Sequence, residues 1–316
     1  MTPDQPSSPD EEPSDAPRVT VVLPVRDEAA WVVEQLDALA GQSTSVPWEG
    51  VVADNGSTDA TRAIVVAHAI GDLVPVRIVD ASRAPGVNVA RNEGARAARG
   101  DLLVFCDGDD RVAPGWLEAY VRSVGARRVV AAGPVEVDAL NSSRRARWGP
   151  WLHRPVEPVP GVAAGWGANM ALPRSVWEQL GGFDESLRQG FDEIELFLRA
   201  GRAGVGFAWV EDARVDYRLP ASAAHYAAKA IAAGRGEQRA RRSGSDPAFA
   251  PLGLAGCARH LLAAVGDLAR PSRTGPGAAR QVLYASGQLI EAVGPARRRL
   301  VRVWGGRRAE GEPGGR

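Results

Sequence analysis

Short apolar runs alternate with amphipathic segments along the first two thirds of the chain. The runs are rich in Val, Ile and Leu, as expected of buried strands, and they predict strands over 19–25, at the start of 50–59, and over 74–80, 101–107 and 128–137. Apolar positions at helical spacing between them predict helices over 28–42, 59–70, 86–100 and 114–125. This alternation favours an α/β fold in which helices cover both faces of a mostly parallel sheet.

The pattern is less regular after residue 138. Segment 139–165 is rich in Arg, Pro and Gly and is expected to form a long loop. The next elements expected are a short strand, a helix and a Gly-Gly turn within 167–185, a helix over 192–204, a strand over 205–210, and helices over 254–270 and 281–293.

Composition divides the chain into three parts. Residues 1–18 are acidic and rich in Pro and Ser, which predicts a disordered tail, and 19–220 carry the α/β pattern. Residues 221–316 are expected to form a basic, largely helical appendage with a flexible end. The 316 residues have zero net charge, but 1–220 hold 22 basic and 32 acidic side chains whereas 221–316 hold 16 and 6. That asymmetry suggests either an anionic partner for the basic part or a solvated arm.

The remaining composition favours an intracellular globular protein. The two cysteines, Cys106 and Cys257, lack metal-ligand spacing, which fits a reducing compartment. A signal peptide and a run of 18 apolar residues are both missing, so we expect a cytoplasmic protein without a membrane span. Lys229 is the only lysine.

Polar side chains gather where the predicted strands end. Ligands of open parallel sheets bind beyond the carboxyl ends of the strands, so residues at several strand ends predict one shared site. The residues at these ends are Arg26, Asp27 and Glu28 after the first strand, Asp54 and Asn55 after the second, and Asp107 and Asp109 after the fourth.

The acidic turn after the fourth strand has two interpretations. Asp107 and Asp109 are two residues apart, so an extended chain directs both carboxylates to one side, and Gly108 between them permits the close approach of a ligand. Carboxylate oxygens suit Mg²⁺ or Mn²⁺ carrying a phosphorylated substrate. Asp-Gly-Asp-Asp is equally good turn chemistry, and the sequence alone leaves both open.

A second acidic group opens the helix expected over 192–204. Acids favour a helix N-terminus, and Glu195 with Arg199 forms an ordinary i,i+4 pair. Glu193, however, shares its face with Leu196 and Phe197, and loss of water there would raise its pKa and make it a better proton acceptor. Asp192 lies on the other face and suits a positioning role.

Several enzyme classes lack their signatures. The chain has neither G-x-G-x-x-G after the first strand nor a P-loop nor G-x-S-x-G, which disfavours dinucleotide dehydrogenases, P-loop enzymes and α/β-hydrolases. Four scattered histidines, at 68, 153, 225 and 260, are expected to be structural or surface residues.

Ordered motifs resemble a known family over roughly 19–220. "VTVVLPVRDEAAWVVEQLDALAGQ", "VVADNGSTDAT", "ARNEGARAARGDLLVFCDGDD", and "GGFDE" followed by "DEIELFLR" are similar to family 2 glycosyltransferases. The resemblance implies the GT-A fold, a Rossmann-like, mostly parallel mixed sheet flanked by helices.

The resemblance also implies roles for the matching positions. The residues implied to bind the nucleotide sugar are Pro24, Val25, Arg26, Glu28, Asp54, Arg91 and Asp107. Asp107 and Asp109 are implied to bind the metal (Mn²⁺ or Mg²⁺), and Trp166 and Gly167 the acceptor. Trp148, Trp151 and Trp166 are candidates to stack on sugar rings, with packing of their loop on the domain as the alternative interpretation. Glu193 falls at the position of the general base with Asp192 beside it, the reverse of the family's common Glu-Asp order. Asp216 stands where many relatives carry a late metal-binding histidine.

The implied reaction is a metal-dependent, inverting transfer from a nucleotide-diphosphate sugar to a sugar or lipid-linked acceptor, as in cell-envelope polysaccharide synthesis. One alternative is a sugar-1-phosphate nucleotidyltransferase, which would carry a glycine-rich, lysine-bearing loop where this chain has "PVRDEAA". Another is a non-catalytic binding protein on the same fold.

The basic region 221–316 has two interpretations of its own. Its charge and apolar positions such as Leu262 and Val265 suit peripheral contact with the inner, anionic face of a membrane. Packing against the catalytic domain, or dimerisation, is the other interpretation. Nucleic acid is disfavoured as a partner because the chain has no recognisable binding module.

Overall fold

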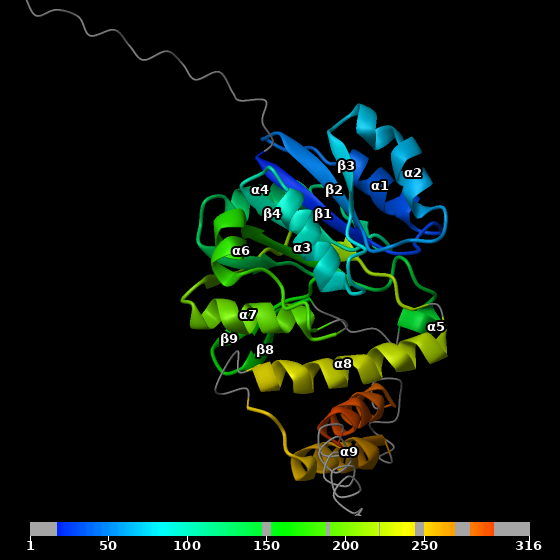
Figure 1. Ribbon diagram of the computed structural model, residues 1–316, viewed down its shortest axis with the longest axis vertical. Helices are drawn as coiled ribbons and strands as arrows, with labels where there is room; N and C mark the ends of the chain where they lie inside the picture. Colours follow the sequence, from blue (N-terminus) through cyan, green and yellow to red (C-terminus); the bar gives the residue numbers. More distant parts are fainter. Residues whose placement is uncertain are drawn as a thin grey trace, which may run out of the picture.

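A seven-stranded mixed sheet forms the centre of the protein (Figure 1). The computed structural model describes residues 18–146, 153–187, 190–220, 222–243, 250–268 and 279–293. The strands run in the order β11-β6-β10-β4-β1-β2-β3, and only β10 is antiparallel to its neighbours. Their bounds are β1 Val19–Val25, β2 Trp48–Asp54, β3 Val76–Asp80, β4 Leu102–Cys106, β6 Val129–Ala132, β10 Asn169–Pro173 and β11 Gly206–Trp209. The predicted mostly parallel α/β fold is confirmed.

Helices cover both faces of this sheet. The helices of this part are α1 Val32–Ala40, α2 Thr61–Ala67, α3 Val87–Ala97, α4 Trp116–Val124, α6 Arg174–Leu180 and α7 Asp192–Arg202, with a short 3-10 turn η1 Ala69–Asp72. Alternate residues of β1 enter different cores: Val21 and Leu23 pack with α1 and α4, and Val22 packs with α3 and α6. Burial on both faces explains why the strands read as continuous apolar runs.

Helix α3 lies unusually close to the sheet. A Cβ placed on Gly94 would come within 2.4 Å of Val22 Cγ1 and 3.4 Å of Ala53 Cβ, so glycine is required at this contact. The close approach fixes the height of α3 above the ends of β1 and β2, and Arg91 lies one turn earlier on the same helix. The position of Arg91 therefore depends on this packing.

Two segments differ from the prediction. The strand expected over 128–137 is divided into β6 and β7 Val135–Glu136, because Gly133 packs directly on the backbone of Ala213 and Pro134 has no N–H to continue a ladder. β7 joins β12 Val215–Asp216 and β5 Arg111–Val112 in a small second sheet.

The loop expected over 139–165 is partly wrong. It contains α5 Ser143–Ala146 and a hairpin of β8 Val156–Val159 and β9 Val162–Ala164, which turns at Gly161 with φ of 79°. Val159 and Ala164 are buried in the same apolar cluster as α7, and this tertiary contact stabilises the hairpin. Trp148 and Trp151 lie outside the described residues.

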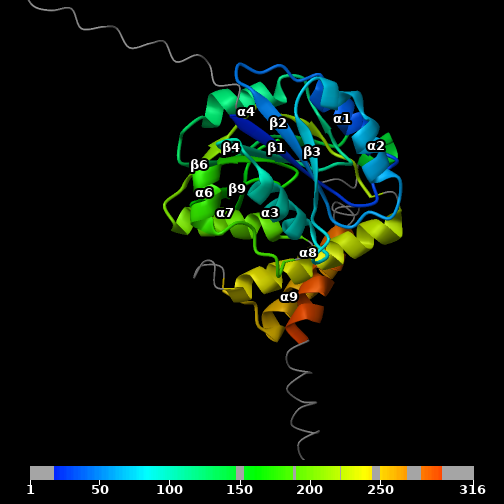
Figure 2. The same ribbon diagram turned by 45° about the horizontal axis from the view of Figure 1, so that its top comes forward.

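The C-terminal region begins with α8 Ala223–Ser243, which runs beneath α7 (Figures 1 and 2). The sequence pattern did not single out this helix. α9 Leu254–Leu268 and a helix over 279–293 lie below it, close to the predicted 254–270 and 281–293. α8 and the helix over 279–293 pack closely at two glycines. A Cβ on Gly234 would lie 1.9 Å from the backbone oxygen of Tyr284, and a Cβ on Gly287 would lie 2.0 Å from that of Ile231. α8 therefore packs on the helix over 279–293 on one side and on the segment that begins α7 on the other.

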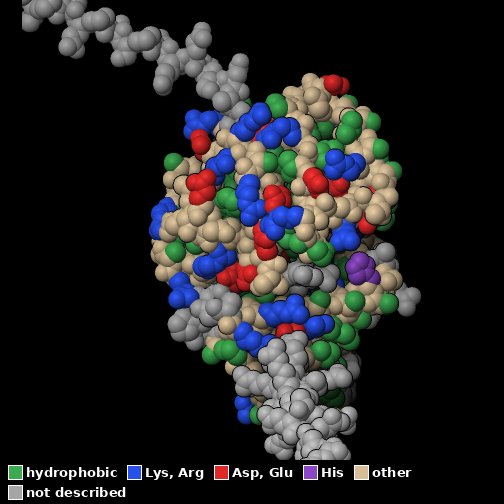
Figure 3. Space-filling model, in the orientation of Figure 1, with side chains coloured by type: hydrophobic (Ala, Val, Ile, Leu, Met, Phe, Trp, Pro, Cys, Tyr) green, Lys and Arg blue, Asp and Glu red, His purple; other side chains and the backbone are tan. Residues whose placement is uncertain are grey.

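Part of the positive charge of this region is neutralised within it. Arg235, Arg239 and Arg242 of α8 all form ion pairs with Glu291. On the face shown in Figure 3, basic and acidic side chains are interspersed. Among the described residues, none of the helices combines the length and the apolar composition that a membrane span requires.

Candidate functional site

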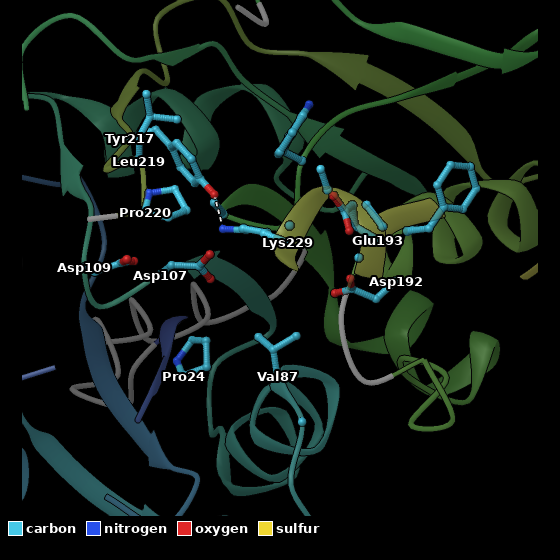
Figure 4. Close-up of a pocket in the computed structure, with 18 of the residues that line it drawn as sticks. Pro24, Val87, Asp107, Asp109, Asp192, Glu193, Tyr217, Leu219, Pro220 and Lys229 are labelled. Atoms are coloured by element: carbon cyan, nitrogen blue, oxygen red, sulfur yellow. Dashed lines mark hydrogen bonds between the residues drawn. The ribbon is translucent and has the colours of Figure 1, made fainter. Parts of the chain in front are cut away.

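A cavity of about 1140 Å³ lies beyond the carboxyl ends of β1 and β4 (Figure 4). It is lined by the segment after β1, the start of α3, the acidic turn after β4, the residues before β10, the start of α7, α8, and the helix over 279–293. The sequence-predicted residues that line it are Pro24, Val25, Arg26, Glu28, Arg91, Asp107, Asp109, Trp166, Gly167, Asp192 and Glu193. Asp54 does not line the cavity, whereas its neighbour Asn55 does.

Asp54 shapes the loop beside the cavity. Its buried carboxylate accepts hydrogen bonds from the Ser57 N–H at 2.8 Å and from Arg62 at 3.0 Å. Both oxygens are thereby engaged in holding the turn after β2. Asn55 from this turn bonds to the backbone of Ala81 and Gly86, which joins the loop to the start of α3.

Three carboxylates converge on the turn after β4. Asp107, Asp109 and Asp110 each offer an oxygen, and these atoms lie within 4.8 Å of one another. Asp110 is fully buried, and one of its carboxylate oxygens accepts a hydrogen bond from the backbone N–H of Arg218 at 2.7 Å. Its other carboxylate oxygen has no hydrogen-bond partner among the described residues. Asp110 is the last residue of the Asp-Gly-Asp-Asp turn, and the sequence pattern assigned it no role.

Glu28 adds a fourth carboxylate to this group. A Cβ on Gly108 would lie 2.0 Å from Glu28 Oε2, so the glycine allows Glu28 to reach over the acidic turn. That oxygen is buried and lacks a hydrogen-bond partner in the described part of the chain. Burial, and then the charge of Asp109 and Asp107, raises the pKa of Glu28 well above its ordinary value.

The acidic cluster consists of Glu28, Asp107, Asp109 and Asp110, and of these only Asp107 forms an ion pair among the described residues, with Arg91. Burial raises the pKa of Asp109, and that of Asp110 further, with the neighbouring carboxylates adding to both shifts. Buried carboxylates with unused oxygens at this spacing are the hard donor set that Mg²⁺ and Mn²⁺ prefer. The residues present fit a divalent cation.

Arg91 joins this cluster to the start of α7. It is 4% exposed and donates to Asp107 at 3.0 Å and to Asp192 at 2.8 Å. Gly167 lies against the guanidinium plane, where a Cβ would come within 2.7 Å of a nitrogen. Arg91 thus fixes Asp107 and Asp192 relative to each other.

Glu193 faces the cavity from the first turn of α7 (Figure 4). Gly190 and Phe191 both have positive φ, 74° and 66°. This left-handed turn directs the chain so that the first residues of α7 line the cavity. Burial, and then the negative charge of Asp192, raises the pKa of Glu193 to about 8, and Arg91 opposes the shift. A carboxyl with that pKa is suited to accept a proton near neutral pH.

Three further side chains complete the description of the site. Asp216 accepts a hydrogen bond from Arg111 at 2.8 Å and does not line the cavity. His225 is exposed, as expected of a surface residue, and lies at the cavity wall. Lys229 of α8 points into the cavity and donates a hydrogen bond to the Tyr217 hydroxyl. The one sequence feature that singles out Lys229 is that it is the only lysine in an arginine-rich chain.

The chain is similar in sequence to known proteins. A sequence model of the family described as Glycosyl transferase family 2 matches residues 20–180. The validoxylamine A glucosyltransferase of Streptomyces hygroscopicus subsp. jinggangensis is 29% identical over 230 residues, covering 61% of this chain and 53% of the relative. The pre-mycofactocin glycosyltransferase of Mycobacterium tuberculosis is 29% identical over 224 residues, covering 66% and 42%. The chain thus spans about half the length of these relatives.

Solved structures share the fold. The mannosyltransferase PcManGT from Pyrobaculum calidifontis, in complex with GDP-Man and Mn²⁺, superposes with a TM-score of 0.52 at 21% identity, covering 94% of this chain and 82% of that one. TarS of S. aureus gives 0.51 at 15% identity, covering 90% and 45%. These similarities confirm the GT-A architecture. With the family model matching half of its length and glycosyltransferases among its relatives, this chain belongs to glycosyl transferase family 2.

Proposed function

We propose that the protein is a metal-dependent, inverting glycosyltransferase that moves a sugar from a nucleotide-diphosphate sugar to an acceptor hydroxyl. The observation that carries the proposal is one cavity whose wall holds both the acidic cluster after β4 and Glu193 at the start of α7. The first suits a cation and a diphosphate, and the second suits an acceptor hydroxyl.

The donor nucleotide is assigned to the side of the cavity near β1. Pro24, Val25, Arg26 and Glu28 line it there, next to Asn55. Asp54 supports this side by holding the turn that carries Asn55. When bound, a divalent cation at Asp107, Asp109 and Asp110 supplies positive charge that holds the diphosphate and offsets the charge it gains on leaving.

Glu193 is assigned as the general base. Its carboxylate takes the proton of the acceptor hydroxyl, and the resulting oxygen nucleophile attacks the anomeric carbon as the bond to the nucleoside diphosphate breaks. Asp192, the neighbouring acid, is held by Arg91 and is not available as a nucleophile. With Glu193 acting as the base and Asp192 held in an ion pair, the reaction proposed is a single displacement, which inverts the anomeric configuration.

The acceptor is assigned to the side of the cavity near Trp166 and Gly167. Trp166 is partly exposed there, and its ring packs edge-on against Tyr217 with ring centres 6.2 Å apart. An aromatic ring held in this way is suited to contact a sugar ring. The acceptor class proposed is a sugar or a lipid-linked sugar.

A donor panel tests the proposed function. Purified protein is incubated with Mn²⁺ and UDP-, GDP-, dTDP- or ADP-sugars, and released nucleoside diphosphate is measured. We expect release from one nucleotide class, its loss on chelation and recovery with Mn²⁺ or Mg²⁺, and an inverted anomeric centre in the NMR spectrum of the product. Release that is unchanged by chelation, or retained configuration, contradicts the proposal.

Peripheral contact with an anionic membrane is proposed for the C-terminal helices. Leu262 and Val265 of α9 are 71% and 46% exposed, and Ile290 is 51% exposed, with the exposed Arg259 on α9. Apolar side chains beside cations are the features that favour interfacial binding. In co-sedimentation of the full chain with anionic and neutral vesicles at low salt, we expect binding to the anionic vesicles only, reduced by Leu262→Asp. Absence of sedimentation with anionic vesicles removes this proposal.

A further inference from the structure

We propose that Lys229 binds the diphosphate of the nucleotide-sugar donor, so that helix α8 of the C-terminal region completes the donor site. This inference rests on the proposed function. It adds a residue from outside the segment of the chain that the family model matches.

Lys229 is presented to the cavity in a fixed orientation. Figure 4 shows its ammonium group pointing from α8 toward the space opposite Asp107 and Asp109. The side chain is accessible to solvent from the cavity, and its nitrogen donates to the Tyr217 hydroxyl and lies 5.1 Å from the centre of that ring. Tyr217 is itself buried and is hydrogen-bonded through its backbone to Glu136. The ammonium group is therefore held in place before any ligand arrives.

The ammonium group lies near the acidic cluster without being paired to it. Lys229, Asp107 and Asp109 line the same cavity and face the same space in Figure 4. Among the described residues, Lys229 forms no ion pair within 4.0 Å of a carboxylate. A ligand that contacts both a cation held by these carboxylates and the Lys229 ammonium group must carry negative charge of its own. A diphosphate carries such charge.

The two arginines beside the acidic cluster, Arg91 and Arg218, are occupied by other groups. Arg91 is buried between Asp107 and Asp192, and Arg218 donates to the Asp109 backbone oxygen and to Glu34 while stacking on Trp31. Lys229 donates to one neutral hydroxyl. An ammonium group has three donors, so two remain for phosphate oxygens.

Helix α8 is also tied to the proposed base. A Cβ on Gly190, in the turn before α7, would lie 2.5 Å from the Cα of Ala233 on α8. The backbone that aims Glu193 at the cavity thus packs directly on the helix that carries Lys229, one turn away. The distance between leaving group and base is set by this contact.

The test compares nucleotide binding by wild type, Lys229→Met, Lys229→Arg and the control Arg235→Gln. Arg235 lies on the same helix outside the cavity, and its partner Glu291 retains Arg239 and Arg242 in the control. Calorimetry gives the affinity for Mn²⁺ alone, and with Mn²⁺ present for UMP, UDP, GMP and GDP. We expect Lys229→Met to weaken diphosphate binding by roughly tenfold or more, and monophosphate binding much less. Lys229→Arg and Arg235→Gln should stay close to wild type.

Binding of Mn²⁺ alone separates this role from a purely structural one. Removing a positive charge near Asp107 and Asp109 should leave Mn²⁺ affinity unchanged or higher, whereas a damaged site would lose it. Equal diphosphate affinity in Lys229→Met and wild type, or a parallel loss of Mn²⁺ affinity, overturns the inference and leaves the proposed function standing. A wild-type protein that binds no nucleoside diphosphate contradicts the proposed function instead.

Discussion

Replacing Glu193 with Gln is expected to slow sugar transfer by about 10²–10⁴-fold while donor affinity stays within a few-fold of wild type. The amide keeps the size of the side chain but cannot take a proton from the acceptor. Glu195→Gln is the matched control, because Glu195 lies on the same helix, pairs with Arg199 at 2.6 Å and does not line the cavity. Transfer by Glu193→Gln above a tenth of the wild-type rate would exclude Glu193 as the base.

The pH profile gives the same assignment an independent test. Glu193 has a pKa of about 8 in the folded protein, and only its ionised form accepts a proton. The kcat/KM of wild type should therefore rise with pH up to about 8 and then level off. Glu193→Gln should lack this rise in its residual activity.

The raised pKa of Glu193 also predicts the sign of a stability effect. Its folded pKa lies above its unfolded one, so folding takes up a proton between the two values and the wild type loses stability as pH rises through that window. Above pH 8 the full cost of the buried charge is present, of the order of a few kcal/mol. Glu193→Gln should therefore resist urea better than wild type at pH 9, and this advantage should vanish near pH 4.

Replacing Asp109 with Asn is expected to reduce transfer by about 10³-fold or more, because it removes a ligand charge from the proposed cation site. Chelation of wild type should give a similar loss, and excess Mn²⁺ should restore the chelated wild type but not the variant. Asp101→Asn is the control, since Asp101 is exposed and pairs only loosely with Arg18 at 3.2 Å. Recovery of Asp109→Asn with Mn²⁺ to wild-type rates would show that this carboxylate does not hold the cation.

The parts of the site that follow from local pattern could be read from the sequence. Buried parallel strands end at one edge of a sheet, and this rule brought Arg26, Glu28, Asp107 and Asp109 to a common cavity. Helical spacing placed Glu193 on the apolar side of α7, where burial raises its pKa. Both arguments use only neighbours within a few residues.

The missed parts depend on packing between distant segments. Only the resemblance indicated a role for Arg91; its burial depends on close packing of Gly94 on β1 and on the carboxylates of Asp107 and Asp192. α8 is held by contact of Gly234 with the helix over 279–293, which no local periodicity reveals. The position of Lys229 in the cavity depends on the same packing of α8, so local sequence pattern could not predict it.

The central claim is that the acidic cluster after β4 holds a divalent cation together with the donor diphosphate. The most direct measurement is the affinity of the preferred nucleoside diphosphate with and without Mn²⁺, in wild type and in Asp109→Asn. We predict that Mn²⁺ strengthens binding by roughly tenfold or more in wild type, and that this gain is lost in the variant. Equal affinity with and without Mn²⁺ in wild type, or the full gain in Asp109→Asn, would contradict the claim.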